Sequence, residues 1–162
     1  MLPIPGEMQR VVTVLIGIPG SGKTHFLNRG GGGAIFSPDS LLLNTRTKKY
    51  VWTRARSAWA WAETYRWFGK WLRYGSGSCA WDATNTKAIL RSPLINIAKG
   101  YGCRVMAIYF KTPLRTCLAR NRQRTPDRRV PEATIRAMHR DLTSPTRSEG
   151  FDSIRTIRSR GR

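Results

Sequence analysis

The chain has 162 residues, of which 40% are hydrophobic and 10% aromatic, and its formal net charge at pH 7 is +20. This length suits one domain, residues 1–162, with a core that buries roughly two-thirds of the unfolded chain's surface. The composition excludes global disorder, and no apolar run is long enough to span a membrane. The 29 Lys and Arg against 9 Asp and Glu favour nucleic acid as a partner, the alternative being a chain that is merely basic.

No secretory signal is expected at the start of the chain. The first ten residues contain Pro3 and Pro5 but no apolar segment before a cleavage site, so the cytoplasm is the expected compartment. We expect residues 1–10 to be an N-terminal extension and residues 158–162 a loose basic tail. The three cysteines are odd in number and lack C-x-x-C spacing, which favours reduced thiols over a disulfide framework or a zinc site.

A glycine-rich segment, residues 17–24, fits G-x-x-x-x-G-K-[ST] and directly follows the apolar run 11–16. A buried strand that ends in such a loop points backbone N–H groups at phosphate oxygens, and the next helix adds its positive dipole end. Lys23 is then expected to bridge the β- and γ-phosphates, and the Thr24 hydroxyl to bind Mg²⁺. The alternative is a glycine-rich turn that matches by chance. The predicted nucleotide contacts are Gly17, Pro19, Gly20, Ser21, Gly22, Lys23 and Thr24.

The first candidate for acid–base chemistry is Asp39. The glycine run 29–33 ends the helix that follows the loop, and residues 34–36 form a short strand. Asp39 leaves that strand at its carboxyl end, where open parallel sheets collect ligand-binding groups. Its alternative role is that of an N-cap on the next helix, and the two roles are compatible.

A long helix is predicted from about Thr47 to Arg73. Its apolar face comprises Ala58, Trp61, Tyr65, Phe68 and Leu72. Off this face, tryptophans alternate with basic residues: Trp52, Trp59, Trp67 and Trp71 with Arg54, Arg56, Arg66, Lys70 and Arg73. This combination suits base stacking with phosphate contacts, but packing of the tryptophans against neighbouring helices is an equal alternative.

A second acidic residue, Asp82, ends the brief strand 79–81. An acid at this position in such a sheet can hold a metal-bound water or orient a substrate-binding arginine. Thr84 or Asn85 is expected to cap the next helix, residues 86–99, which contains Pro93.

The remaining chain continues the alternation of strand and helix, which indicates a parallel sheet with helices on its faces. Residues 103–110 are a buried strand, and Pro113 opens a helix that runs into residues 120–129 with five arginines. A helix then runs from Val130 to about Leu142, and residues 151–157 form a last strand. The arginine-rich hairpin suits a lid that stabilises charge on a transferred phosphoryl group, the alternative being a solvated helix end.

Taken together, these motifs resemble the P-loop kinase domain of phage-type polynucleotide 5′-hydroxyl kinases. In order, the chain has G-x-P-G-S-G-K-T, a strand-end Asp, D-x-T-N, an R-N-x-x-R lid and a V-P-x-x-x-[LI]-R-x-M helix. The resemblance implies an α/β P-loop NTPase/kinase fold: a parallel sheet of about five strands, helices on both faces and an Arg-rich lid. It also implies ATP, or another nucleoside triphosphate, and Mg²⁺.

The resemblance assigns roles residue by residue. Lys23 and Thr24 become the phosphate and metal contacts, Asp39 the base for a 5′-hydroxyl, and Asp82 a second essential acid that reaches the metal through water. Arg120 and Arg124 match lid arginines, with Arg124 the transition-state clamp and Arg120 also a nucleotide contact. Thr84 and Asn85 of D-x-T-N are candidate substrate contacts. Family members carry an acceptor-binding Arg where this chain has Leu42, and Arg46 is a hypothetical substitute.

The predicted activity is therefore transfer of the ATP γ-phosphate to 5′-hydroxyl ends of DNA or RNA, as in nucleic-acid repair, in a host cytoplasm if the chain is phage-encoded. A weaker resemblance to zeta-toxin-like and antibiotic-phosphorylating kinases makes a small-molecule acceptor the main alternative. A third possibility is an ATP-dependent nucleic-acid-binding module without an acceptor. No membrane partner is expected, and the choice between DNA and RNA and the oligomeric state stay open.

Overall fold

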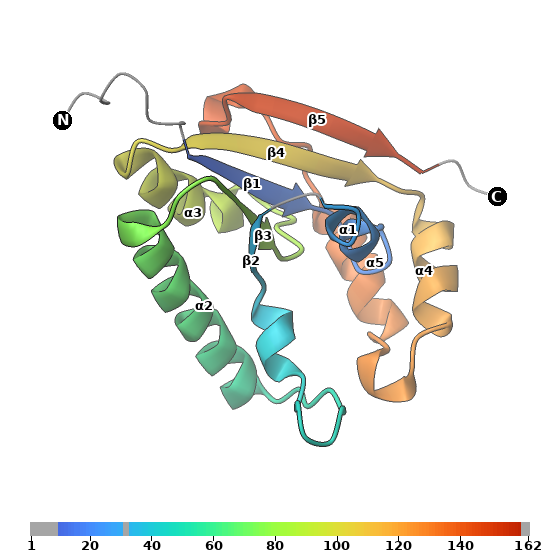
Figure 1. The fold of residues 1–162 in the computed structure, drawn as a ribbon. Helices are drawn as coiled ribbons and strands as arrows, with labels where there is room; N and C mark the ends of the chain where they lie inside the picture. Colours follow the sequence, from blue (N-terminus) through green and yellow to red (C-terminus); the bar gives the residue numbers. More distant parts are fainter. Residues whose placement is uncertain (1–9, 31–32, 160–162) are drawn as a thin grey trace.

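The computed structural model describes residues 10–30 and 33–159, which form a parallel five-stranded sheet flanked by helices (Figure 1). The strands are β1 (Val11–Ile16), β2 (Ala34–Phe36), β3 (Ser78–Asp82), β4 (Arg104–Lys111) and β5 (Ser153–Arg158). The helices are α1 (Lys23–Leu27), α2 (Arg54–Tyr74), α3 (Ala88–Gly100), α4 (Leu114–Arg122) and α5 (Glu132–Asp141). Three 3-10 turns join them: η1 (Pro38–Leu42), η2 (Pro126–Arg128) and η3 (Arg147–Glu149). The predicted α/β class with a five-stranded parallel sheet is confirmed.

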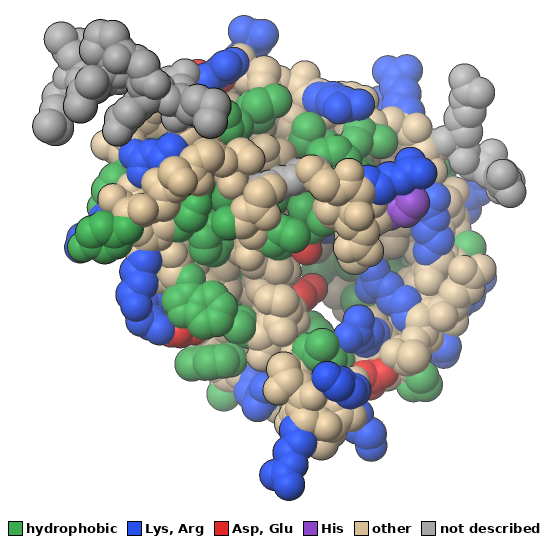
Figure 2. All heavy atoms as spheres, in the orientation of Figure 1, with side chains coloured by type: hydrophobic (Ala, Val, Ile, Leu, Met, Phe, Trp, Pro, Cys, Tyr) green, Lys and Arg blue, Asp and Glu red, His purple; other side chains and the backbone are tan. Residues whose placement is uncertain are grey.

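Some expectations fall on parts of the chain outside the described residues. They are most of the N-terminal extension, residues 1–9, the end of the basic tail, residues 160–162, and the middle of the glycine run, Gly31 and Gly32. In the part that is described, no helix is long and apolar enough to cross a membrane. Basic side chains are spread over the visible surface and acidic ones are few (Figure 2).

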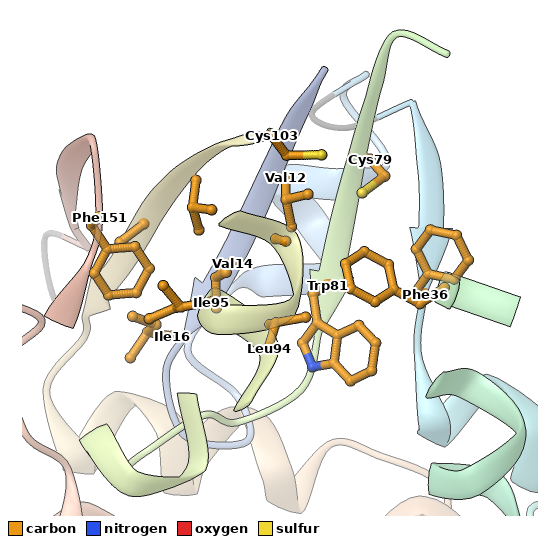
Figure 3. Close-up of a cluster of buried hydrophobic side chains, with 14 of the residues drawn as sticks. Val12, Val14, Ile16, Phe36, Cys79, Trp81, Leu94, Ile95, Cys103 and Phe151 are labelled. Atoms are coloured by element: carbon orange, nitrogen blue, oxygen red, sulfur yellow. The ribbon is translucent and has the colours of Figure 1, made fainter. Parts of the chain in front are cut away.

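Strand β1 lies at the centre of the sheet, whose order is β2-β3-β1-β4-β5. It pairs in parallel with β3 and β4, so its side chains are covered on both faces, which is why the strand is rich in Val and Ile. On one face, Val12, Val14 and Ile16 pack against α2 and α3 in the main core cluster (Figure 3). On the other face, Leu15 packs against Leu27 of α1.

Two further features of the core position the site. A third apolar cluster of Ile18, Cys117, Leu118 and Ile135 fastens α4 and α5 to the loop after β1. The aromatic part of the main core centres on Trp81, whose ring lies 4.7 Å from that of Tyr65 and 5.3 Å from that of Phe68. The three cysteines are buried and free, as expected.

Helix α2 begins at Arg54, so the prediction that it starts near Thr47 was wrong. The segment before it makes other hydrogen bonds: the Asn44 side chain accepts from the backbone N–H groups of Arg46 and Thr47. Leu43 and Tyr50 form an antiparallel bridge, and Thr53 caps the helix by accepting from the Arg56 N–H. Local side-chain and turn hydrogen bonds therefore outweigh helical propensity here.

The buried face of α2 also differs from the predicted one. It consists of Ala60, Thr64, Phe68 and Leu72, whereas Ala58 is exposed. Trp61 lies against Tyr65 and Trp81 but stays 38% exposed. Trp71, predicted off the core face, packs on Phe36 and Phe68.

Two predicted caps are not formed. Lys87 occupies the N-cap position of α3, without a side-chain cap, so neither Thr84 nor Asn85 serves there. Ser37 occupies the N-cap position of η1, and Asp39 lies in its first turn. Thr84, Asn85 and Asp39 are therefore available for other contacts.

Candidate active site

The loop between β1 and α1 has the geometry of a phosphate cradle. Gly20 and Gly22 have φ angles of 83° and 110°, which favour glycine. A Cβ on Gly20 would lie 2.6 Å from the Cys117 carbonyl oxygen, so the loop also packs too closely on α4 for a side chain. The Ser21 hydroxyl is buried and has no hydrogen-bond partner among the described residues, which is consistent with a polar ligand completing the loop.

The Lys23 side chain is held by backbone carbonyls of this loop. Its Nζ donates to the Gly17 carbonyl at 2.6 Å and to the Ile18 carbonyl at 3.3 Å. Burial lowers the pKa of Lys23 to about 8, although the negative charges of Asp82 and Asp39 oppose the shift. A phosphate that enters the loop would add negative charge and favour the protonated amine.

Asp82 lies at the carboxyl end of β3, next to β1, as predicted. Its Oδ2 accepts a hydrogen bond from the Ser37 hydroxyl at 3.3 Å. Burial raises the pKa of Asp82, while Lys23 and the Ser37 hydrogen bond act in the opposite direction. The carboxylate and the amine are therefore electrostatically coupled at the centre of the site.

Asp39 is exposed and lies in η1, after β2. Its Oδ1 accepts a hydrogen bond from the Tyr50 hydroxyl at 3.3 Å. Burial and the charge of Asp39 raise the pKa of Tyr50, so this hydroxyl stays protonated and remains a donor. Asp39 thus has one oxygen oriented by Tyr50, and its other oxygen accepts no hydrogen bond from the described residues.

The arginine hairpin lies over the carboxyl edge of the sheet. Arg120 on α4 donates to the Gly20 carbonyl at 3.1 Å and to Ser159 at 3.1 Å, which ties the lid to the phosphate loop. Arg124 lies just beyond α4 and affects the pKa of both Lys23 and Tyr50. Its charge therefore acts on the phosphate side and on the Asp39 side.

Two pockets meet at Arg124. One, of about 680 Å³, is lined by the phosphate loop, the start of α1, Arg120 and Arg124. The other, of about 610 Å³, is lined by Lys48, Lys49 and the hairpin residues 124–128. In Figure 2 a hollow opens between the lid and the segment around η1, with basic side chains along its lid side.

A direct hydrogen bond joins the two walls of the second pocket. The Tyr50 backbone N–H donates to Asp127 Oδ2 at 2.8 Å, across 77 residues of sequence. The Thr125 side chain and this Tyr50 bond hold the pKa of Asp127 below its usual range. The pocket's acid is therefore engaged, and its four basic residues, Lys48, Lys49, Arg124 and Arg128, leave it strongly positive.

The remaining predicted site residues lie elsewhere. Arg46 is exposed and does not line either pocket. The Asn85 side chain is buried and donates to the Leu15 carbonyl at 2.7 Å, and the Thr84 carbonyl accepts from the Gly17 N–H at 3.0 Å. Thr84 and Asn85 of the D-x-T-N motif thus hold the end of β1 and the start of the phosphate loop in place.

Tyr50, Lys48 and Lys49 are site residues that sequence reasoning missed. They lay inside the segment assigned to the long helix, which hid their approach to Asp39 and the lid. The available signal was the pair of Asn44 and Thr53, a turn former and a helix cap on either side of a non-helical stretch.

Nucleotide and metal can be tested against the residues present. The unpartnered Ser21 hydroxyl, the positive-φ glycines and the buried amine suit a triphosphate. Among the described residues no group of three or more His, Cys, Asp or Glu could hold a metal ion. Mg²⁺ needs few protein ligands when phosphates supply oxygens, so the Thr24 hydroxyl and the Asp82 carboxylate fit it.

A parallel sheet with a phosphate-binding loop after its central strand and an arginine lid over that loop defines a P-loop kinase fold. The chain belongs to the AAA_33 family of AAA domains, whose model matches residues 12–145. No curated protein matches the chain.

Solved structures of similar fold include a chain of an RNA repair complex, an ATP complex and a sugar kinase. A chain of the Pnkp1/Rnl/Hen1 RNA repair complex is 16% identical with a TM-score of 0.70, over 85% of this chain and 46% of that one. A chain of the AvrRxo1-ORF1:-ORF2 structure with ATP is 22% identical with a TM-score of 0.63, over 82% of this chain and 47% of that one. A sugar kinase from Janibacter sp. HTCC2649 is 16% identical with a TM-score of 0.62, over 93% of this chain and 86% of that one. This chain spans less than half the length of the first two, and the likenesses show the fold.

Proposed function

We propose that the protein is an ATP-dependent polynucleotide kinase that phosphorylates 5′-hydroxyl ends of DNA or RNA. The observation that carries the proposal is the position of Arg124, which lines both the phosphate-loop pocket and the basic pocket. Asp39 is linked to the basic pocket through Tyr50, which donates its hydroxyl to Asp39 and its backbone N–H to Asp127. A kinase must transfer its phosphoryl group between a donor and an acceptor pocket, and a cation at their junction stabilises that group in transit.

The residues divide the work of transfer among them. ATP supplies the γ-phosphoryl group. Thr24 and Asp82 would hold Mg²⁺, which when bound would offset the charge of the phosphates. Asp39 accepts the proton of the acceptor hydroxyl while that oxygen bonds to the γ-phosphorus and the bond to the ADP oxygen breaks. Lys23, Arg120 and Arg124 stabilise the phosphoryl oxygens, and Tyr50 holds Asp39 in place.

A polynucleotide acceptor is supported by the charge of the second pocket. Leu42, at the position of the family's acceptor-binding arginine, is 2% exposed and cannot contact an acceptor. Lys48, Lys49 and Arg128 supply positive charge in the second pocket instead. A phosphate next to the terminal nucleoside of a nucleic acid would be attracted there. The fold likeness to a chain of an RNA repair complex agrees with this acceptor, and the likeness to AvrRxo1 with ATP agrees with the donor.

The direct test is transfer of labelled γ-phosphate from ATP with Mg²⁺ to matched oligonucleotides that carry a 5′-hydroxyl or a 5′-phosphate. We expect label on the 5′-hydroxyl strand alone, its loss in Lys23→Ala, and a fall of about a hundredfold or more in kcat for Asp39→Asn. Full turnover in folded Asp39→Asn would contradict the base assignment. ATP turnover without labelled strand would favour an ATP-dependent binding module.

A small-molecule acceptor is the second candidate, favoured by the structural likeness to a sugar kinase over 93% of this chain. The same assay with sugars and antibiotic alcohols in place of the oligonucleotide separates the two. Label on a neutral small acceptor and none on any 5′-hydroxyl strand would replace the polynucleotide proposal.

A further inference from the structure

The outward side of α2 carries large aromatic side chains that no described part of the chain covers. Trp59 is 51% exposed, Trp67 44% and Tyr74 84%, and Trp52, just before the helix, is 63% exposed. None of the four makes an aromatic contact among the described residues, in contrast to Trp61, Trp71 and Trp81. We call these four residues, with Lys70 and Arg73, the outer face of α2.

The aromatics follow one another along a single strip. At about 100° and 1.5 Å per residue, Trp59, Trp67 and Tyr74 lie within about 80° of each other and about 10–12 Å apart along the axis. The helix has 21 residues, so the strip extends over about 30 Å. The aromatic rings are therefore spaced regularly along one side of the helix.

The charge of this strip is positive. Helix α2 has five basic residues and one acidic residue, Glu63, which pairs with Arg66. Lys70 and Arg73 are exposed and have no acidic partner among the described residues. In Figure 2 hydrophobic and basic side chains lie side by side over α2. The ligand that matches exposed rings and cations together has negative charge and flat apolar faces.

We propose that the outer face of α2 binds single-stranded polynucleotide, with bases stacked on the tryptophans and phosphates near the basic residues. Stacking on aromatics in a basic groove is how single strands are held without sequence preference. The amino end of α2 packs against η1, which carries Asp39. The direction of the strand, with its 5′ end at Asp39, rests on the proposed function; the binding itself does not.

The test measures binding of labelled 12-mers of dT and of U by anisotropy, without ATP. Trp59→Ala/Trp67→Ala should weaken binding at least tenfold, because each stacked base contributes about 1–3 kcal/mol. Trp59→Phe/Trp67→Phe should restore part of the loss. The matched control, Ile89→Ala/Leu90→Ala, removes exposed apolar side chains of α3, 73% and 54% exposed, and should leave binding unchanged. Comparison of the dT and U arms tells DNA from RNA.

Unchanged affinity in the folded tryptophan double variant would overturn the proposal, as would a wild-type protein that binds neither 12-mer. A change of oligomeric state in the variant with unchanged affinity would also overturn it and assign the face to a second copy. Phosphoryl transfer to a dinucleotide with a 5′-hydroxyl should be equal in the variant and the wild type, since Trp59 and Trp67 line neither pocket. If no polynucleotide is phosphorylated but the variant still loses binding, the outer face stands and the proposed function fails.

Discussion

The surroundings of Lys23 change the acid–base chemistry of its amine. The amine is enclosed beneath the phosphate loop and donates to two backbone carbonyls, so its charge lacks the solvation that it has in water. Asp82 and Asp39 recover part of that loss but leave the pKa at about 8. The free protein therefore has a lysine that titrates close to neutral pH.

This shift predicts that ATP binding depends on pH. The charged amine is present below pH 8 and is lost above it, while bound phosphates favour the protonated form, so binding must take up a proton at higher pH. The Kd for ATP should rise by about tenfold from pH 7 to pH 9 at constant ionic strength. Calorimetry in buffers of different ionisation enthalpy measures the proton uptake directly. In Lys23→Met the pH dependence should disappear; an equal dependence in that variant would assign it to another group.

At the scale of elements, Asn85 links β1 to the turn after β3. It has a φ of 48°, unusual for a residue other than glycine, and its buried amide donates to the Leu15 carbonyl. Together with the bond from the Gly17 N–H to the Thr84 carbonyl, it holds the start of the phosphate loop against β3. The D-x-T-N motif thus acts on the site through the backbone.

Replacing Asn85 separates two contributions to stability. Asn85→Ala loses the hydrogen bond and strains the positive φ, so the free energy of unfolding should fall by about 2–4 kcal/mol. Asn85→Gly loses the same hydrogen bond but relieves the strain. Its free energy of unfolding should therefore fall by about 1–2 kcal/mol less than that of the alanine variant. Urea denaturation measures both. Equal losses in the two variants would mean that backbone strain contributes nothing at this position.

The hairpin and the segment before α2 are coupled elements. Asp127 accepts from the Tyr50 N–H, and Tyr50 in turn donates its hydroxyl to Asp39. A movement of the lid over bound phosphate would therefore change the position of Tyr50 and of its hydrogen bond to Asp39.

Elsewhere the buried Arg91 pairs with Glu149 and fastens η3 to α3, a structural role away from the site.

At the scale of the whole molecule, the net charge of +20 predicts strong salt dependence for a charged acceptor. For an oligonucleotide acceptor, log KM should rise with log salt, and Lys48→Ala/Lys49→Ala should reduce that slope by about 1.4, since each contact with a single strand contributes about 0.7. Arg46→Ala is the matched control, because Arg46 lies outside the pocket. Equal slopes in both variants would contradict the assignment of this pocket to the acceptor.

The sequence alone determined the parts of the protein that depend on neighbours along the chain. The loop 17–24, the alternation of strands and helices, and the positions of Asp39 and Asp82 after their strands all follow from local patterns. The same local reasoning placed the start of α2 too early, because a turn at Asn44 and a cap at Thr53 carry a weaker signal than amphipathic spacing.

The tertiary structure decided which distant residues meet. Tyr50 reaches Asp127 across 77 residues, and Arg124 lines two pockets, each built from segments far apart in the chain. Trp71 is partly buried, while Trp59 and Trp67 are exposed. Such contacts depend on how helices pack on the sheet, and packing couples residues whose separation in sequence carries no periodic signal. The phosphate loop can therefore be predicted from the sequence, whereas the pocket that we propose for the acceptor depends on the tertiary structure.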